Sequence, residues 1–218
     1  MHKKLTLTFD NGPHPVGTPL VLQTLAERRI LANFFPIGEK IAAEGGEALV
    51  AAVKQAGHRV GIHTLTHSLP LGLGAPGFAR HEITEGQARL GTYAESPPLF
   101  RPYAGKGILG PHVLNQEAVE VLQQQGFTLV LWNSVPRDWE LPTHGWVTRA
   151  LEDIAAQPWT VMVLHDTRPE AMEHLGDFLD RLVLRDVEIT QQLPDWVMPI
   201  QAGVARHPFA ALVAPANA

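Results

Sequence analysis

The strongest constraint on the fold is the regular alternation of short apolar segments with longer amphipathic segments along most of the chain. The short segments are rich in β-branched and aromatic residues and predict strands, whereas the long ones show the apolar spacing of helices. Strands that alternate with helices favour parallel pairing, either in a barrel or in a doubly wound sheet. The expected strands are 5–9, 31–38, 59–63, 97–105, 127–132, 159–164 and 187–190, and the expected helices are 18–29, 39–55, 78–94, 115–125, 146–156 and 169–184.

Composition limits the classes of protein that this chain can belong to. The 218 residues are 45% apolar, which suits one large globular domain with a real core. The net charge of −5 offers no basic footprint, so we expect no nucleic-acid partner. The chain has no cysteine, which excludes disulfides and thiolate metal sites.

Nothing in the sequence predicts membrane insertion or export. No apolar run approaches the roughly 20 residues that a membrane span needs. The first expected strand begins within a few residues of Met1, so no signal peptide precedes it. If that chain start is native, we expect a cytoplasmic protein without a membrane partner.

Polar side chains that can do chemistry follow several of the expected strands. Asp10 and Asn11 end the first strand at a Gly-Pro turn, although both could simply cap that turn. The carboxyl ends of parallel strands open on one face of a barrel, so these side chains are expected to share one pocket. The other strand-end groups are His63, His67, Arg101, Asp138, His165 and Asp166.

His63 and His67 form a candidate metal-binding pair. Their i, i+4 spacing would let both imidazoles reach one cation from a single helical turn. The alternative is that one histidine caps a turn and the other is exposed. Zinc also requires a third ligand, commonly a carboxylate, and an open position for water.

Six segments, taken in order, resemble the motifs of the polysaccharide deacetylase family, which contains the NodB-type domain of carbohydrate esterases. Residues 8–13 (TFDNGP) are similar to the family's Thr-Phe-Asp-Asp-Gly-Pro signature, and residues 57–67 resemble its histidine motif. The other similar segments are 32–38, 100–103, 137–139 and 163–166. The resemblance implies a deformed (β/α) barrel of about seven parallel strands. It would occupy residues 1–190, and residues 191–218 would form a tail that packs on the barrel or extends from it.

The resemblance also implies catalytic roles. Asp10 would be the general base that takes a proton from water, and Arg101 would hold it in place. His165 would be the general acid for the leaving amine, and Asp138 would tune it. A base and an acid on opposite sides of the scissile bond can move the two protons that amide hydrolysis requires.

The same resemblance implies a metal site and a substrate pocket. His63, His67 and the residue at position 11 would hold a divalent cation, usually zinc. Tyr103 would offer a backbone N–H to the oxyanion, and Trp139 and Leu164 would line the acyl pocket. A cation that polarises the carbonyl and a fixed donor for the oxyanion are consistent with hydrolysis.

Two positions depart from the family pattern. The third metal ligand of the family is an acid, whereas this chain has Asn11, whose neutral amide is a weak partner for zinc. The family's arginine motif usually reads Arg-x-Pro-aromatic-Gly, whereas here Pro102 directly follows Arg101. This departure leaves the oxyanion donor open: Tyr103 still has an N–H to offer, and Pro102 has none. We therefore expect a weakly held divalent metal, or none.

Three interpretations of function remain open from the sequence. The leading one is a hydrolase of C–N amide bonds that removes acetyl from an N-acetylated sugar or oligosaccharide with a weakened metal site. The second is a metal-independent hydrolase of a small cyclic amide. The third is a non-catalytic barrel that binds a carbohydrate or another metabolite. In each case the expected partner is a small or oligomeric molecule, N-acylated if the chain is an enzyme.

Overall fold

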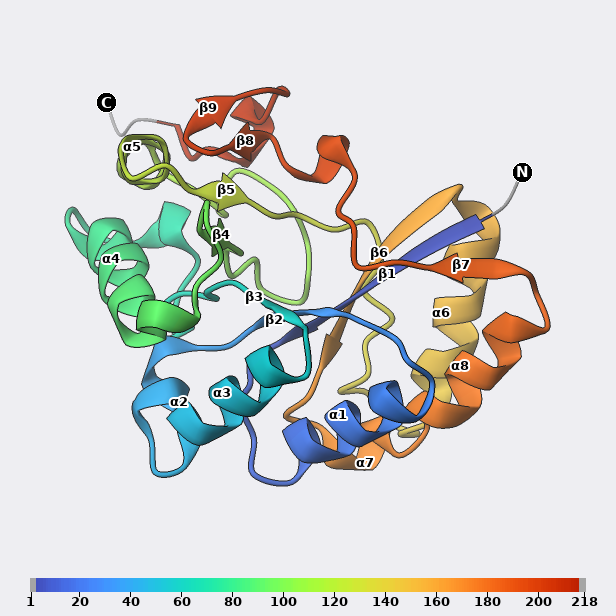
Figure 1. Cartoon of the computed structure of the whole chain (residues 1–218). Coiled ribbons are helices and arrows are strands. Elements are labelled where there is room, and N and C mark those ends of the chain that lie inside the picture. Colours follow the sequence, from blue (N-terminus) through green and yellow to red (C-terminus); the bar gives the residue numbers. More distant parts are fainter. Residues whose placement is uncertain (1–2, 216–218) are drawn as a thin grey trace.

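Seven parallel strands form the centre of the molecule. A computed structural model describes residues 3–215, and its main sheet has the strand order β3-β2-β1-β6, with β7 also paired to β1 (Figure 1). β4 and β5 form a second parallel pair. The strands are β1 (Lys3–Asp10), β2 (Asn33–Phe35), β3 (Arg59–Val60), β4 (Leu99–Phe100), β5 (Thr128–Leu129), β6 (Trp159–His165) and β7 (Val187–Ile189).

Isolated bridges connect the two parallel sheets into a deformed barrel. Ile62 pairs with Phe100 beyond the end of β3, and Ser134 pairs with Met162 of β6. The two sheets are therefore joined around the barrel by single β-bridges and not by continuous ladders of hydrogen bonds. This arrangement confirms the predicted α/β class and the deformed parallel barrel, although several strands are much shorter than expected.

β1 is the axis of this arrangement because it pairs with three other strands. Leu5, Leu7 and Phe9 are at most 1% exposed and pack in the main apolar cluster. Successive strand side chains point to opposite faces, so Thr8 and Asp10 point away from that cluster. In the register, Asp10 lies level with His165 of β6. The polar ends of neighbouring strands are thereby brought to the same level.

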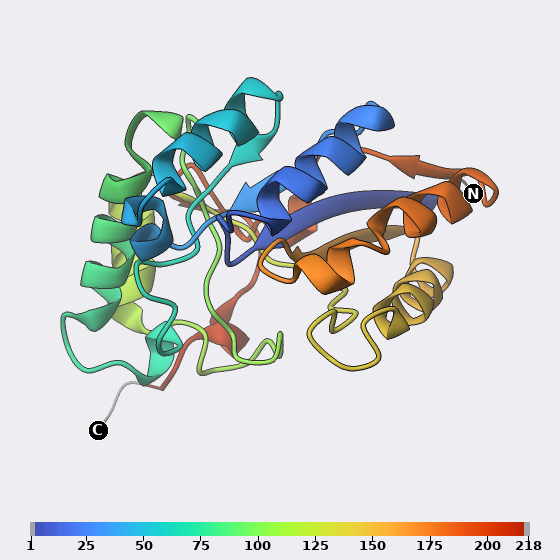
Figure 2. The same ribbon diagram turned by 90° about the horizontal axis from the view of Figure 1, so that it is seen from below.

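Helices surround the strands (Figures 1 and 2). Two expected helices are broken: 39–55 is interrupted at Gly45, which has φ 73°, and 169–184 is interrupted around His174. The first break begins at Ala43, whose extended backbone (ψ 162°) ends α2, and the left-handed Gly45 directly precedes α3. The helices are α1 (Gly17–Glu27), α2 (Gly38–Ala42), α3 (Gly46–Gln55), α4 (Phe78–Leu90), α5 (Gln116–Gln124), α6 (Gly145–Ala156), α7 (Pro169–Met172) and α8 (Leu175–Val183).

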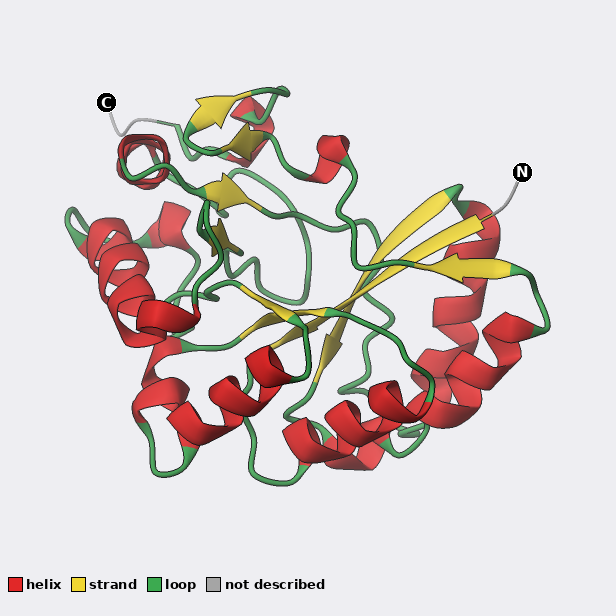
Figure 3. Cartoon of the chain, viewed as in Figure 1, coloured by secondary structure: helices red, strands yellow, loops and turns green. Residues whose placement is uncertain are grey.

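The segment after β7 packs on the barrel as far as the structure describes it. It contains a short antiparallel pair, β8 (Ile200–Gln201) and β9 (Val204–Ala205), which lies beside β5 and α5 (Figure 3). The N–H of Leu131 donates to the carbonyl of Val197 at 2.8 Å, which attaches this segment to the chain after β5. Residues 216–218 of the expected tail lie outside the described residues, and the division at residue 190 stays a prediction.

Among residues 3–215, none of the helices is both long and apolar enough to span a bilayer.

Candidate active site

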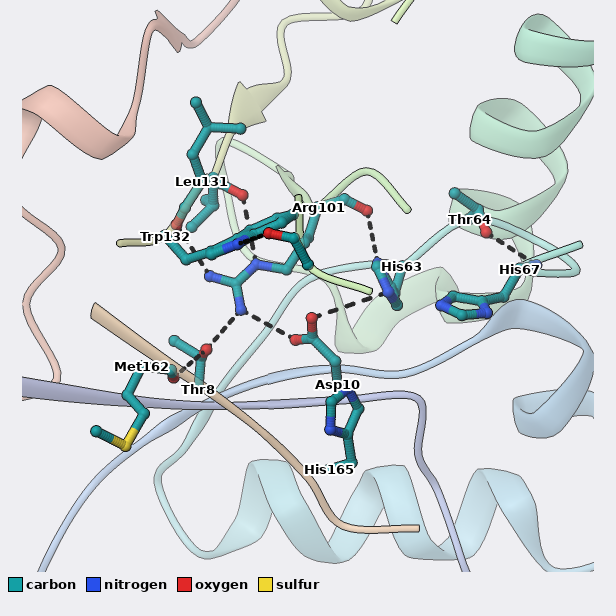
Figure 4. A network of polar contacts seen from close by, with 12 residues as sticks. Thr8, Asp10, His63, Thr64, His67, Arg101, Leu131, Trp132, Met162 and His165 are labelled. Atoms are coloured by element: carbon teal, nitrogen blue, oxygen red, sulfur yellow. Dashed lines mark hydrogen bonds and ion pairs between the residues drawn. The ribbon is translucent and has the colours of Figure 1, made fainter. Parts of the chain in front are cut away.

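Asp10 and Arg101 form a buried ion pair at the end of β1. The Arg101 guanidinium donates to Asp10 Oδ1 at 3.0 Å and to the Thr8 hydroxyl at 2.5 Å, and the Thr8 hydroxyl in turn donates to the carbonyl of Met162 at 2.6 Å (Figure 4). The side chains of Arg101 and Asp10 are 0% and 4% exposed. A charge-assisted bond in such a dry environment fixes the carboxylate strongly.

The rest of the Arg101 side chain is also held. Its Nε and second terminal nitrogen donate to the carbonyls of Val130 and Leu131 at 3.3 and 3.2 Å. The guanidinium carbon lies 4.2 Å from the ring centre of Phe35 and 5.5 Å from that of Trp132. These contacts connect β1 to the segment after β5 and orient the Asp10 carboxylate.

His63 and His67 lie next to each other, but on an irregular loop and not on a helical turn. Thr64 and His67 have φ values of 62° and 56°, and the loop folds back so that the two ring centres are 4.8 Å apart. The helical geometry assumed from the i, i+4 spacing is therefore wrong. The Nδ1–H of His63 donates to the carbonyl of Arg101 at 2.8 Å, which leaves its Nε2 lone pair 3.8 Å from Asp10 Oδ2.

Both histidines are suited to act as neutral ligands. Burial lowers the pKa of His63 and of His67 to about 3, so each imidazole is uncharged at neutral pH. Asn11 lines the same cavity, and its Oδ1 is a buried acceptor without a hydrogen-bond partner among the described residues. Two neutral imidazoles and one unpaired amide oxygen fit a divalent cation, although the set carries no negative charge. Within residues 3–215, no group of three His, Cys, Asp or Glu side chains forms a metal-binding cluster.

His165 is the last residue of β6 and forms hydrogen bonds with Asp138. Its Nδ1–H donates to Asp138 Oδ1 at 2.7 Å, and its backbone N–H donates to Asp138 Oδ2 at 2.7 Å. Burial alone would lower the pKa of His165, but the attraction and hydrogen bond of Asp138, together with the attraction of Asp10 and Asp166, raise the pKa above the ordinary value. Trp139 packs edge-on against the imidazole, with ring centres 5.2 Å apart. Of the three histidines that line the cavity, His165 is therefore the one whose protonated form is favoured.

These groups surround one cavity of about 240 Å³. Asp138 and Arg101 are behind its wall and act on it through His165 and Asp10. Leu164 does not line it: Leu164 pairs with Phe9 and is fully buried, whereas its neighbour Val163 pairs with Thr8 and faces the cavity. The sequence-predicted residues that line the cavity are Asp10, Asn11, His63, His67, Tyr103, Trp139 and His165.

Tyr103 is placed to contribute through both its ring and its backbone. Its ring centre lies 3.8 Å from that of His67. Its backbone N–H has no hydrogen-bond partner in the part of the chain that the structure describes. The role of this N–H as an oxyanion donor stays a prediction.

Several site residues were not predicted from the sequence. Trp132, which is buried in the main apolar cluster, also lines the cavity, and its indole N–H donates to the carbonyl of Gly107 at 3.0 Å. Lys106 and Val135 also line it, on loops without a motif. Asp166 was noted as a strand-end group, but it lies outside the cavity wall, where burial raises its pKa to about 6.

Known proteins are similar to this chain in both sequence and fold. Residues 1–130 match the family model described as "Polysaccharide deacetylase". The chain belongs to the polysaccharide deacetylase family. A chitooligosaccharide deacetylase of Rhizobium leguminosarum bv. phaseoli is 32% identical over 175 residues, which is 79% of this chain and 72% of that protein. The predicted family and enzyme class, a polysaccharide deacetylase-like hydrolase of carbon–nitrogen bonds, are thereby confirmed.

Solved structures of polysaccharide deacetylase family members have the same fold. A polysaccharide deacetylase from Bacillus cereus is 26% identical, has a TM-score of 0.73, and the match covers 92% of this chain and 97% of that one. A protein from Bacillus anthracis described as a family 4 carbohydrate esterase pseudoenzyme is 17% identical with a TM-score of 0.71, over 86% of this chain and 63% of that one. At that identity, the second likeness shows the fold alone.

Proposed function

We propose that this chain hydrolyses the acetamide C–N bond of an N-acetylated sugar or oligosaccharide, with help from a weakly held divalent cation. The observation that carries the proposal is the meeting of Asp10 and His165 at one cavity, level with each other on adjacent strands. One is a carboxylate held by a buried arginine, and the other is an imidazole held by a buried carboxylate.

The proposed proton transfers follow from the charges of the two groups. Asp10 accepts the proton of the attacking water, and its pairing with Arg101 keeps the carboxylate oriented. His165, protonated through Asp138, gives a proton to the departing amine nitrogen. The new C–O bond forms first and gives a tetrahedral oxyanion; the C–N bond then breaks as the nitrogen is protonated, and the products are a free amine and acetate. General acid–base catalysis of this kind contributes roughly 10²–10⁴-fold each to rate.

The oxyanion and the acyl group have candidate partners in the same cavity. The unpaired backbone N–H of Tyr103 is the proposed donor to the oxyanion, and such a donor contributes about 10²–10³-fold to rate. Trp139 packs against His165 and also lines the cavity, so it is the proposed wall for the acetyl methyl group. Val163 takes the wall position that we had expected for Leu164.

His63, His67 and Asn11 would hold the cation, for which zinc is the expected metal. When bound, it supplies Lewis acidity that polarises the scissile carbonyl. The two histidines are neutral and Asn11 Oδ1 is unpaired, which supports the assignment. Because Asn11 brings no negative charge, we propose that the affinity is low and that activity depends on added metal.

The test is incubation with N-acetylglucosamine oligomers, with and without added Co²⁺ or Zn²⁺, followed by measurement of acetate and free amine. We expect acetate and amine in equal amounts, at a rate that rises with added metal. A small cyclic amide serves as the comparison substrate for the metal-independent alternative. Failure to release product from any acyl amide, with or without metal, would contradict the proposal.

The second candidate function is carbohydrate binding without hydrolysis, and it is favoured by the presence of Asn11 in place of an acidic metal ligand. A protein that has lost the acidic ligand could keep its cavity and bind a carbohydrate without hydrolysing it. A protein of the same fold is described as a pseudoenzyme, which supports the existence of such members. Calorimetric binding of the oligomers, without release of acetate during long incubation with metal, would favour this alternative.

A further inference from the structure

Glu82 is a buried carboxylate outside the cavity that none of the proposed steps uses. It is 1% exposed and lies on the inner face of α4, between Ala79 and Gly86. A buried carboxylate is unfavourable unless hydrogen bonds compensate for the water it has lost. The partners of Glu82 are therefore informative about its purpose.

All its hydrogen bonds go to the loop between the two histidines. Glu82 Oε2 accepts the backbone N–H groups of Leu65 at 3.1 Å and Thr66 at 3.0 Å. Glu82 Oε1 accepts the hydroxyl of Thr66 at 2.8 Å. One side chain thus holds two of the three residues that separate His63 from His67.

The start of α2 holds the same loop from the other side. The N–H groups of Gly38 and Glu39 donate to the carbonyls of Thr64 and Leu65 at 3.0 and 2.9 Å. Gly86, one turn beyond Glu82, packs so closely that a Cβ there would lie 3.0 Å from the carbonyl carbon of Thr64. The loop is therefore clamped between α2 and α4.

This clamp explains how an irregular loop with two left-handed residues keeps a single shape. Positive φ values at Thr64 and His67 are unfavourable for residues with side chains, and such strain persists only where the surroundings determine it. The Thr64 hydroxyl also accepts the N–H of His67 at 3.0 Å. These contacts set where the two imidazoles point.

We propose that Glu82 is a positioning residue that holds His63 and His67 side by side as a pre-formed pair of metal ligands. The inference rests on the proposed metal-assisted function. Because Asn11 adds no charge to the ligand set, binding depends more than usual on ligands that need no rearrangement. Hydrogen bonds around metal ligands commonly change metal affinity by about 10–100-fold when they are removed.

Two substitutions separate the hydrogen bonds of Glu82 from its charge. Glu82→Gln retains an oxygen for both N–H groups, and its amide can donate to the Thr66 hydroxyl oxygen. Glu82→Ala removes all three bonds. Glu85→Ala, at an exposed position on the same helix, is the matched control. Gly86→Ala disturbs the loop while it leaves the carboxylate in place.

The experiment measures Co²⁺ affinity by calorimetry and by the visible spectrum of bound Co²⁺, in the wild-type and Asn11→Asp backgrounds. We expect Glu82→Ala to weaken Co²⁺ binding by about 10-fold or more, and Gly86→Ala to weaken it too. Glu82→Gln should stay within about twofold of the parent, and Glu85→Ala should match it. Wild-type affinity in Glu82→Ala or in Gly86→Ala, or equal losses in Glu82→Ala and Glu82→Gln, would overturn the proposal.

A metal-free measurement separates this inference from the proposed function. Hydrogen exchange of the Leu65 and Thr66 amides, and the nuclear Overhauser contact between the two imidazoles, report the loop alone. Glu82→Ala should speed exchange at both amides and remove the ring contact. If neither background binds Co²⁺, the metal-assisted function fails, and these two signals decide whether Glu82 positions the histidines; unchanged signals would refute that role.

Discussion

Replacement of Arg101 by methionine should destabilise the protein strongly. The change removes the buried partner of Asp10 and the donors to the carbonyls of Val130 and Leu131. Methionine is long and flexible enough to fill much of the space beside Trp132, so the main effect is electrostatic rather than a cavity. The Asp10 carboxylate, 4% exposed, would be left without its cation.

The magnitude follows from the burial of both partners. Removal of one member of a buried ion pair destabilises proteins by about 3–5 kcal/mol because the remaining charge is uncompensated. For a chain of 218 residues, each kcal/mol corresponds to roughly 2–4 °C in melting temperature. We therefore expect Arg101→Met to lose about 4 kcal/mol of unfolding free energy and roughly 8–16 °C in Tm.

Urea unfolding followed by circular dichroism, with calorimetry for Tm, is the assay. Arg28→Met is the control, because Arg28 pairs with Asp180 at 2.8 Å but the Asp180 side chain is 64% exposed, and such pairs contribute at most about 1 kcal/mol. The double variant Asp10→Asn/Arg101→Met should be more stable than Arg101→Met, since it lacks the orphaned charge. A loss under about 1 kcal/mol in Arg101→Met, or a less stable double variant, would refute the reasoning.

Four further outcomes are expected. Asn11→Asp should raise Zn²⁺ affinity markedly because it adds an anionic ligand; equal metal content in both variants by elemental analysis would contradict this. Because the pKa of His165 is raised, kcat/KM should persist above pH 6.5 and fall at higher pH, and Asp138→Asn should move that fall to lower pH. Because burial raises the pKa of Asp166 to about 6, the folded state binds an extra proton between about pH 4 and 6, so the unfolding free energy of the wild type should decrease as the pH rises from about 4 to about 6. Asp166→Asn should not show this decrease, and urea titrations at both pH values would detect the difference. Gly12→Ala should lose about 1–3 kcal/mol by the same titrations, since its Cβ would lie 2.4 Å from the Asp166 carboxylate.

The main features of the fold were predictable because local periodicity decides them. Parallel strands follow from alternation with helices, and Gly126 and Pro169 mark helix ends as expected. The break at Gly45 could not be predicted from an apolar stripe that continues across it. The short lengths of β3, β4 and β5, two residues each, could not be predicted either, because the extent of each ladder depends on the tertiary arrangement of its neighbours.

The sequence predicted those site residues that lie at the carboxyl ends of strands, but not the residues that support them from elsewhere in the fold. Asp10 and His165 meet because both end strands of one parallel pair, β1 and β6, and parallel pairing is what the sequence predicts. We had placed Leu164 in the cavity wall, but it is level with Phe9 and its side chain points away from the cavity. Val163, which is level with Thr8, lines the cavity in its place. Glu82 offered a usable signal that we did not use: it is a charged residue at an apolar-face position of a helix, between Ala79 and Ile83.

The central claim is that one cavity combines a base and an acid for amide hydrolysis. It is tested most directly by acetate release from N-acetylglucosamine oligomers in the presence of Co²⁺, compared between the wild type and Asp10→Asn. We predict measurable acetate from the wild type and none above background from Asp10→Asn, with both proteins folded by circular dichroism. Equal acetate release from the two proteins would contradict the account.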